Sequence, residues 1–210
     1  MSQHGVFISF EGGDGVGKST QLGLLAQWLV AGGHEVVTTR EPGGTPLGAE
    51  LRQVVMHGEH VSPRAEALIY AADRAHHVAT VVRPALARGA VVLSDRYLDS
   101  SVAYQGSGRE LGPAEVERIN LWAAQDLLPD LTVLLDLDPA LGLARLTGEP
   151  DRLERAGADF HARTRQAFTD RAGADPDRWF VVDAAAAVEA VHERVRERVG
   201  RLLAGMASRP

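Results

Sequence analysis

The sequence predicts an α/β fold of three layers, in which a five-stranded parallel sheet carries helices on both faces. Short, continuous apolar runs recur along the chain, and helix-like segments separate them. Such runs are typical of strands buried on both faces, and these strands belong to parallel sheets covered by helices. The five predicted strands are residues 6–10, 36–39, 90–94, 131–137 and 179–182.

Apolar spacing predicts a helix after the first strand and another that closes the chain. Spacings of three and four residues place one side chain above the next on a single helix face. Asp138 followed by Pro139 reads as the start of a further helix, with a side-chain cap and proline at the first helical position; a second metal ligand is the alternative for Asp138. The two apolar stripes are Leu22, Leu25, Ala26 and Leu29, and Val188, Val191, Val195, Val199 and Leu202.

Composition favours one soluble domain that acts on a small anionic substrate. The chain has 210 residues, 45% of them hydrophobic and 24% charged, with a formal net charge of −6. This charge argues against a broad nucleic-acid surface, so positive charge for phosphate binding must be gathered in a cleft. We expect one domain over residues 1–206 and a loose tail over residues 207–210.

The sequence also predicts a cytoplasmic protein. The chain contains no cysteine, so disulfides and thiolate metal sites are excluded. The first predicted strand begins within a few residues of the N-terminus, which leaves no room for a signal peptide. No apolar run approaches the length of a membrane span, so we expect no membrane association.

Residues 12–19 read G-G-D-G-V-G-K-S, the phosphate-binding loop (P-loop) pattern, between a predicted strand and a predicted helix. Glycines let backbone N–H groups turn toward phosphate oxygens, and the helix N-terminus adds partial positive charge. Lys18 would reach the β- and γ-phosphates, and the Ser19 hydroxyl would ligate Mg²⁺. The predicted ATP-binding residues are Gly12, Gly13, Asp14, Gly15, Val16, Gly17, Lys18, Ser19 and Thr20.

Asp95 and Arg96 follow the third predicted strand, at the sheet edge where ligands bind in such folds. Asp95 is a candidate second Mg²⁺ residue with Ser19, and Arg96 is a candidate clamp for an acceptor phosphate and for the transferring group. An ordinary surface ion pair at the end of a strand is the alternative.

Four motifs at residues 12–19, 40–45, 70–74 and 95–106 read GGDGVGKS, REPGGT, YAADR and DRYLDSSVAYQG. In this order and spacing they resemble the motifs of bacterial thymidylate kinases. The resemblance implies a P-loop nucleoside monophosphate kinase fold with a short mobile lid at about residues 145–155. It also implies transfer of the γ-phosphoryl group of ATP to dTMP, giving dTDP, with Mg²⁺ as cofactor and a homodimer formed through helices beside the sheet.

Roles at the acceptor base follow from this resemblance. Arg74 matches the residue that donates to a thymine carbonyl, and Tyr70 matches the aromatic that stacks on the base. Ser101 and Gln105 match residues that face the polar edge of the pyrimidine. The family usually has phenylalanine at the position of Tyr70, so the extra hydroxyl needs a polar partner or a route to water.

Roles at the acceptor phosphate and sugar are implied in the same way. Arg52 and Arg96 match the pair that holds the monophosphate, with Glu41 close by to orient them. Tyr104 matches the residue that crowds the 2′ position of the sugar, and Asp14 approaches the 3′-hydroxyl. A solvated helix arginine is the alternative for Arg52, a core aromatic for Tyr104, and a loop cap for Asp14.

The resemblance places Lys18, Arg96 and Asp14 in the catalytic set, together with one further cation. Family members place that cation in the P-loop or in the lid, and positions 13–16 here carry no basic residue. The charge should then come from the lid, with Arg152 the first choice, Arg145 the second and Arg155 also near.

Two other functions remain open at this point. The same fold could phosphorylate another nucleotide or a nucleoside, although a nucleoside kinase would not need both Arg52 and Arg96. A non-catalytic, ATP-dependent switch would not need a base pocket built from Tyr70, Arg74 and Gln105. His76 and His77 are adjacent and point to different sides of a helix, so we predict no metal pair there.

Overall fold

Five parallel strands form the central sheet of the computed structural model, in the order β2-β3-β1-β4-β5. The structure describes residues 5–58, 60–147, 149 and 151–207. The predicted fold class and all five predicted strands are confirmed, with boundaries shifted by one residue in places. The strands are β1 (Val6–Glu11), β2 (Val36–Arg40), β3 (Val91–Asp95), β4 (Leu131–Asp136) and β5 (Trp179–Asp183).

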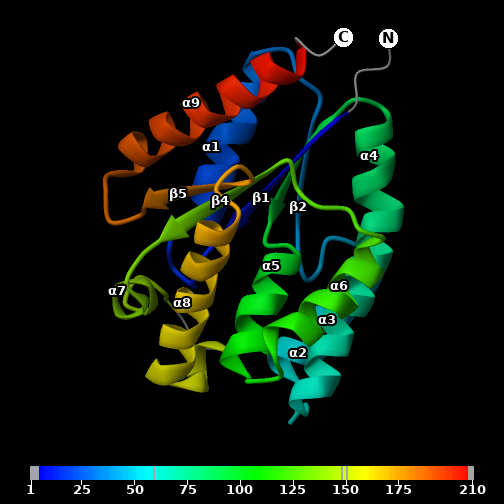
Figure 1. The fold of residues 1–210 in the computed structure, drawn as a ribbon, viewed down its shortest axis with the longest axis vertical. Coiled ribbons are helices and arrows are strands. Elements are labelled where there is room, and N and C mark those ends of the chain that lie inside the picture. Colours follow the sequence, from blue (N-terminus) through cyan, green and yellow to red (C-terminus); the bar gives the residue numbers. More distant parts are fainter. Residues whose placement is uncertain (1–4, 59, 148, 150, 208–210) are drawn as a thin grey trace.

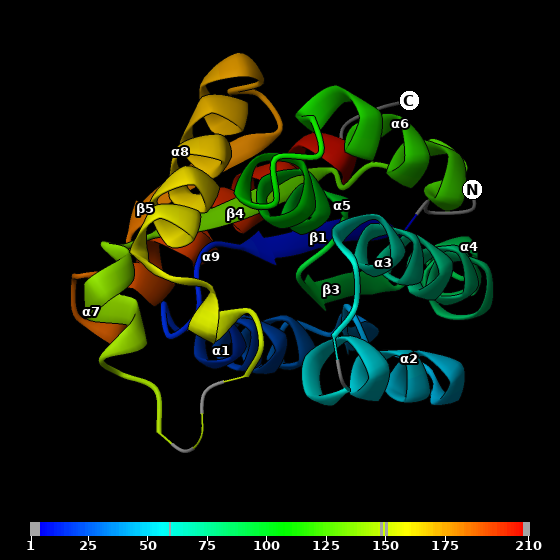
Figure 2. The same ribbon diagram turned by 90° about the horizontal axis from the view of Figure 1, so that it is seen from below.

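Helices cover both faces of the sheet, and α1 lies opposite α5, α6 and α8 in Figure 2. On the α1 side, α9 packs along α1 and beside β5 (Figure 1). The helices are α1 (Lys18–Ala31), α2 (Pro46–His57), α3 (Pro63–His77), α4 (Arg83–Ala87), α5 (Leu98–Ser101), α6 (Pro113–Ala124), α7 (Pro139–Leu143), α8 (Ala158–Ala174) and α9 (Val188–Ala207). Two π-helical segments, η1 (Val78–Val82) and η2 (Val102–Gly108), continue α3 and α5, and a short 3₁₀ turn, η3 (Glu154–Ala156), precedes α8.

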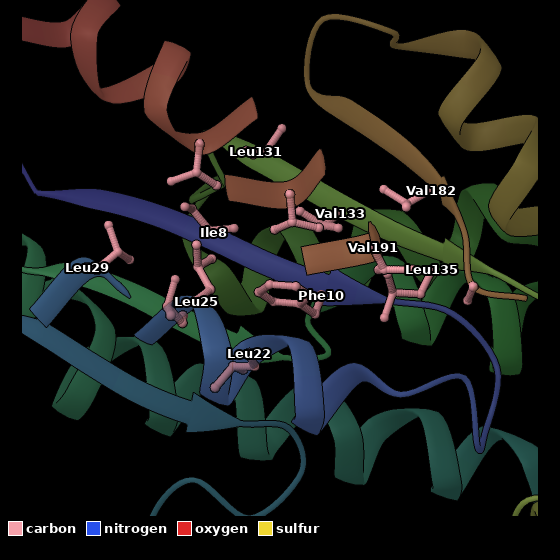
Figure 3. Close-up of a cluster of buried hydrophobic side chains, with 14 of the residues drawn as sticks. Ile8, Phe10, Leu22, Leu25, Leu29, Leu131, Val133, Leu135, Val182 and Val191 are labelled. Carbon is pink, nitrogen blue, oxygen red and sulfur yellow. The ribbon is translucent and has the colours of Figure 1, made fainter. Parts of the chain in front are cut away.

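Alternation along the strands divides the core between the two faces. Ile8 and Phe10 of β1 pack against Leu25 of α1, together with residues of β4, β5 and α9 (Figure 3). Phe7, next to Ile8 in the sequence, points to the other face and stacks edge-on against Tyr97. Because all five strands run the same way, the loops after β1, β3 and β4 meet at one edge of the sheet.

Two boundaries can be compared with the sequence prediction, the helix start at Asp138 and the end of the domain. The Asp138 side chain accepts a hydrogen bond from the Ala140 N–H at 2.9 Å, with Pro139 first in α7, so the cap prediction is confirmed. Helix α9 includes Ala207, one residue beyond the predicted domain end, and residues 208–210 of the predicted tail lie outside the described residues. Within the described chain, no helix is both long and apolar enough to cross a membrane.

Helix α7 lies directly against the P-loop, backbone to backbone. Gly15 faces the carbonyl oxygen of Gly142, and Gly142 faces that of Asp14, so a Cβ atom at either glycine would overlap a carbonyl oxygen. Glycine is therefore required on both sides of this contact.

We expect Gly142→Ala to destabilise the fold by about 1–3 kcal/mol, because backbone must move to admit the methyl group. Gly173→Ala is the matched control: it lies in α8, and an added Cβ would meet nothing within 4 Å. This variant should be neutral or slightly stabilising. Urea unfolding measures both, and equal stability of the two variants would contradict the close contact between α7 and the P-loop.

Candidate active site

The P-loop joins β1 to α1 in a backbone conformation that depends on glycine. Gly12, Gly15 and Gly17 have φ angles of 131°, 71° and 96°. Side chains other than glycine rarely adopt such angles, so these glycines let the loop curl at the sheet edge. The loop therefore has the conformation that a phosphate cradle needs.

Lys18, the first residue of α1, is the only lysine in the chain. Its Nζ donates to the carbonyl oxygens of Gly12 at 3.2 Å and Gly13 at 2.6 Å, and the side chain is buried. Burial, together with the nearby Arg96 charge, lowers the pKa of Lys18 to about 8. An anion bound in the loop would offset the cost of burying the charged ammonium. The position of Lys18 therefore favours binding of a phosphate group.

Ser19 and Asp95 converge from the loops after β1 and β3. The Ser19 hydroxyl donates to the Asp95 carboxylate at 2.9 Å in a solvent-exposed position, and Thr20 follows it, also exposed. A hydroxyl and a carboxylate are hard oxygen ligands of the kind that Mg²⁺ takes alongside substrate phosphates. The residues at this point therefore fit the predicted Mg²⁺ site.

Arg96 has a strained backbone that aims its side chain at the P-loop. Its φ of 69° lies in the left-handed region, which is uncommon for a residue other than glycine. The guanidinium donates to the Gly12 carbonyl at 3.0 Å, to Ser100 at 3.1 Å and to Asp14 at 2.6 Å. Strain of this kind is characteristic of functional positions.

Asp14 and Tyr104 complete this cluster. The Tyr104 hydroxyl donates to Asp14 at 3.1 Å, and the Arg96 guanidinium lies over the Tyr104 ring, 4.9 Å from its centre. Burial alone would raise the pKa of Asp14, but Arg96, Lys18 and the hydrogen bonds hold it below its ordinary value. Asp14 is therefore ionised at neutral pH, at the point where the P-loop meets Arg96.

A partly open cavity lies beside this cluster. Asp14, Asp151 and Leu153 are among the residues that line it, so it extends from the P-loop to the lid segment. All eight residues predicted to bind the acceptor also line it: Glu41, Arg52, Tyr70, Arg74, Arg96, Ser101, Tyr104 and Gln105.

Arg74 is a fully buried residue of the cavity wall. Its Nε donates to Glu41 at 2.8 Å, and Nη1 donates to Ser101 at 3.2 Å and to Asn120. These partners come from the loop after β2, from α5 and from α6. A guanidinium held from three directions presents its donors at a fixed position.

The structure differs from the sequence prediction in what Glu41 orients. Its carboxylate pairs with Arg74 at 2.7 Å and with His77 at 2.7 Å, and not with Arg52 or Arg96. Arg74 and His77 are three residues apart on α3 and so face Glu41 together. Arg52 instead donates to the Pro42 carbonyl at 3.2 Å.

Comparison with known proteins identifies the family. The family model described as thymidylate kinase matches residues 10–195. The chain is 63% identical over 208 residues to a thymidylate kinase of Clavibacter michiganensis subsp. michiganensis, covering 97% of this chain and 99% of that protein. It is 54% identical over 187 residues to a thymidylate kinase of Deinococcus radiodurans, covering 88% and 90%.

The chain belongs to the thymidylate kinase family. The resemblance drawn from the four sequence motifs is thereby confirmed, and the chain is an ATP-dependent phosphotransferase. A thymidylate kinase of Bifidobacterium longum is 55% identical over 203 residues, covering 94% of this chain and 98% of that protein.

The lid arginines of this thymidylate kinase family member do not converge on the P-loop in this structure. The Arg152 guanidinium pairs with Glu66 of α3 at 2.6 Å, and Arg155 donates to the Asp151 carbonyl within the lid. Arg145 donates to the Ala184 carbonyl after β5. The predicted lid spans residues 145–155, of which residues 148 and 150 lie outside the described residues.

Several polar residues near the cavity were not predicted from the sequence as site residues. His77 and Asn120 hold the Glu41 and Arg74 groups, and Glu66 holds Gln105 at 2.8 Å. Arg165 of α8 forms a bidentate pair with Asp136 next to the P-loop, at 2.7 and 2.9 Å. The local signal for three of them, Glu66, His77 and Asn120, is that each polar side chain falls on the buried face of its helix.

Because Lys18 is the only lysine of the sequence, its altered pKa can be measured directly. In nucleotide-free protein labelled with [¹³C]lysine, NMR should show one side-chain signal that titrates near pH 8. Burial disfavours the charged amine, so the proton leaves at lower pH than in the unfolded chain, where the midpoint should return to about 10.4. The same midpoint in folded and urea-unfolded protein would contradict the buried position of the ammonium.

Proposed function

We propose that this chain transfers the γ-phosphoryl group of ATP to the 5′-phosphate of dTMP, giving dTDP, with the acceptor in the cavity described above. One observation carries the proposal. All eight side chains predicted for the acceptor line a single cavity, and Asp14 lines both this cavity and the smaller one beside the P-loop. Two phosphorylated nucleotides can therefore meet end to end at the carboxyl edge of the sheet.

On the donor side, Lys18 and the P-loop backbone bind the β- and γ-phosphates of ATP. Ser19 and Asp95 would hold Mg²⁺, which supplies positive charge to the phosphate oxygens. The Arg145 guanidinium is held by the Ala184 carbonyl after β5, so we do not assign it the predicted catalytic role.

On the acceptor side, Arg52 and Arg96 bind the monophosphate. Arg96 also reaches the P-loop, so it lies where it can stabilise charge on the group in transfer. Asp14 orients Arg96 and lies near the sugar, and the Tyr104 ring crowds its 2′ position.

The base end of the acceptor site is built for a pyrimidine with a carbonyl edge. Arg74 can offer only hydrogen-bond donors, which match the carbonyl of thymine. Tyr70, nearly fully buried in the cavity wall, offers a ring face for stacking, and Ser101 and Gln105 line the same end.

A homodimer and a cytoplasmic location also belong to this proposal. Helices α3 and α6 pack against each other beside the sheet. Each exposes a large apolar side chain, with Leu68 of α3 57% exposed and Trp122 of α6 82% exposed. Exposed apolar groups of this size support an interface between two copies of the chain through these helices.

The other candidate functions are less well supported. A nucleoside kinase has no use for Arg52 and Arg96 together at the acceptor phosphate. A nucleotide-dependent switch has no use for the cavity that holds Arg74.

Incubation with Mg²⁺-ATP and single monophosphates tests the proposed function through ADP formation. We expect dTMP to be the best acceptor, because its carbonyl edge meets donors and its sugar lacks a 2′-hydroxyl. Since one methyl group is worth about 1–3 kcal/mol, dUMP should react about 10- to 200-fold less efficiently, and UMP less efficiently still. ADP formation that needs no acceptor would favour the switch, and equal rates with dTMP and UMP would contradict the role of Tyr104.

Arg96→Ala should reduce turnover by about 10³-fold or more, because it removes the charge between acceptor and donor. Arg88→Ala is the matched control, since Arg88 is an exposed arginine after α4 paired with Glu35. Thermal unfolding should show both variants folded. Turnover of folded Arg96→Ala within tenfold of the control would remove Arg96 from the catalytic set.

A further inference from the structure

Glu66 of α3 is a fully buried carboxylate beside the acceptor cavity, with an exposed fraction of 0%. A buried charge is tolerated only where other groups compensate it. Its compensating groups come from three segments: Gln105 of η2 at 2.8 Å, Arg109 after η2 at 3.4 Å, and Arg152 of the lid at 2.6 Å. Glu66 therefore joins the base end of the acceptor site to the lid.

The Glu66 carboxylate determines which end of the Gln105 amide faces the cavity. An ionised carboxylate can only accept hydrogen bonds, so Gln105 must turn its NH₂ group toward Glu66. The Gln105 carbonyl oxygen then faces the cavity, where it can accept a hydrogen bond from the base of dTMP. Arg74 supplies hydrogen-bond donors beside this carbonyl oxygen. The cavity therefore presents a hydrogen-bond donor for the C4 carbonyl of thymine and a hydrogen-bond acceptor for its N3–H. Cytosine has the opposite pattern, an amino group next to an acceptor nitrogen.

The same carboxylate anchors the lid through its other oxygen. Gln105 binds Oε1 of Glu66, whereas the Arg152 guanidinium pairs with Oε2. Arg152 also donates from Nε to the Val55 carbonyl of α2 at 2.9 Å. The residues on either side of it, Asp151 and Leu153, line the acceptor cavity. Arg152 thus holds the lid segment over the acceptor and is directed away from the P-loop.

We propose that Glu66 is a positioning residue that sets base selectivity through Gln105 and holds the lid over the acceptor through Arg152. This proposal rests on dTMP being the acceptor. Glu66 does not line the cavity in which the acceptor lies, so it acts through its two partners. Arg152, predicted from the sequence as the catalytic cation, becomes the lid side of this contact.

A double-mutant cycle with Glu66→Gln, Arg152→Gln and the double variant tests the proposal, with kcat and KM measured for dTMP and dCMP. Glu66→Gln frees the Gln105 amide to turn, so the preference for dTMP over dCMP should fall by about tenfold or more. Arg152→Gln should raise the KM for dTMP by more than it lowers kcat, with the base preference retained. Because Glu66 and Arg152 are in contact, the fold-loss of kcat/KM for dTMP in the double variant should be smaller than the product of the fold-losses in the two single variants.

The matched control is Glu35→Gln, which makes the same charge change at an exposed carboxylate before β2 and should match the unaltered chain. The proposal would be overturned if the loss of kcat/KM in the double variant equalled the product of the single losses. It would also be overturned if Glu66→Gln kept the preference for dTMP over dCMP. If Glu66→Gln does not fold, Arg152→Gln decides alone, and a loss confined to kcat overturns the proposal. Failure of the unaltered chain to phosphorylate dTMP would instead contradict the proposed function.

Discussion

The ion pair between Arg96 and Asp14 is the contact on which the rest of the site depends. It joins the loops after β3 and β1, and through the Gly12 carbonyl and Tyr104 it binds the P-loop to the acceptor cavity. The left-handed backbone of Arg96 is held by the fully buried Glu11, which accepts from the Tyr97 N–H at 2.8 Å and from Ser100 at 2.5 Å. Burial, with the nearby Asp99 charge, raises the pKa of Glu11 to about 7. A buried carboxyl group, Glu11, thus fixes the backbone that positions the Arg96 guanidinium.

Buried carboxylates paired with arginines recur around the acceptor side, at Glu41, Glu66 and Asp99. Asp99 pairs with Arg171 at 2.5 Å and Arg178 at 2.7 Å, which ties α5 to α8 and to the start of β5. Such pairs add little net stability, but removing one partner costs about 3–5 kcal/mol because the other charge is left buried. Their effect is to fix positions: each pair holds a segment that carries acceptor-site residues, and the acceptor cavity is shaped before any ligand arrives.

The sequence predicted what depends on local pattern and missed what depends on distant partners. The strands and the P-loop could be predicted because apolar runs and glycine spacing act within a few residues. The partners of Glu41 could not, because nothing local decides whether a buried carboxylate meets Arg52 or Arg74. Arg152 was assigned from its lid position, yet Glu66, far from it in sequence, draws it toward α3. The acceptor residues themselves could be named in advance only through family resemblance, since their shared cavity is built by the whole fold.

A crystal structure with dTMP and a non-hydrolysable ATP analogue tests most directly whether donor and acceptor meet at Arg96. The expected result is a 5′-phosphate oxygen of dTMP within about 3 Å of the Arg96 guanidinium, with the thymine between Tyr70 and Arg74 and the γ-phosphate at Lys18. A monophosphate bound elsewhere, or an Arg96 side chain turned away from both phosphates, would contradict it.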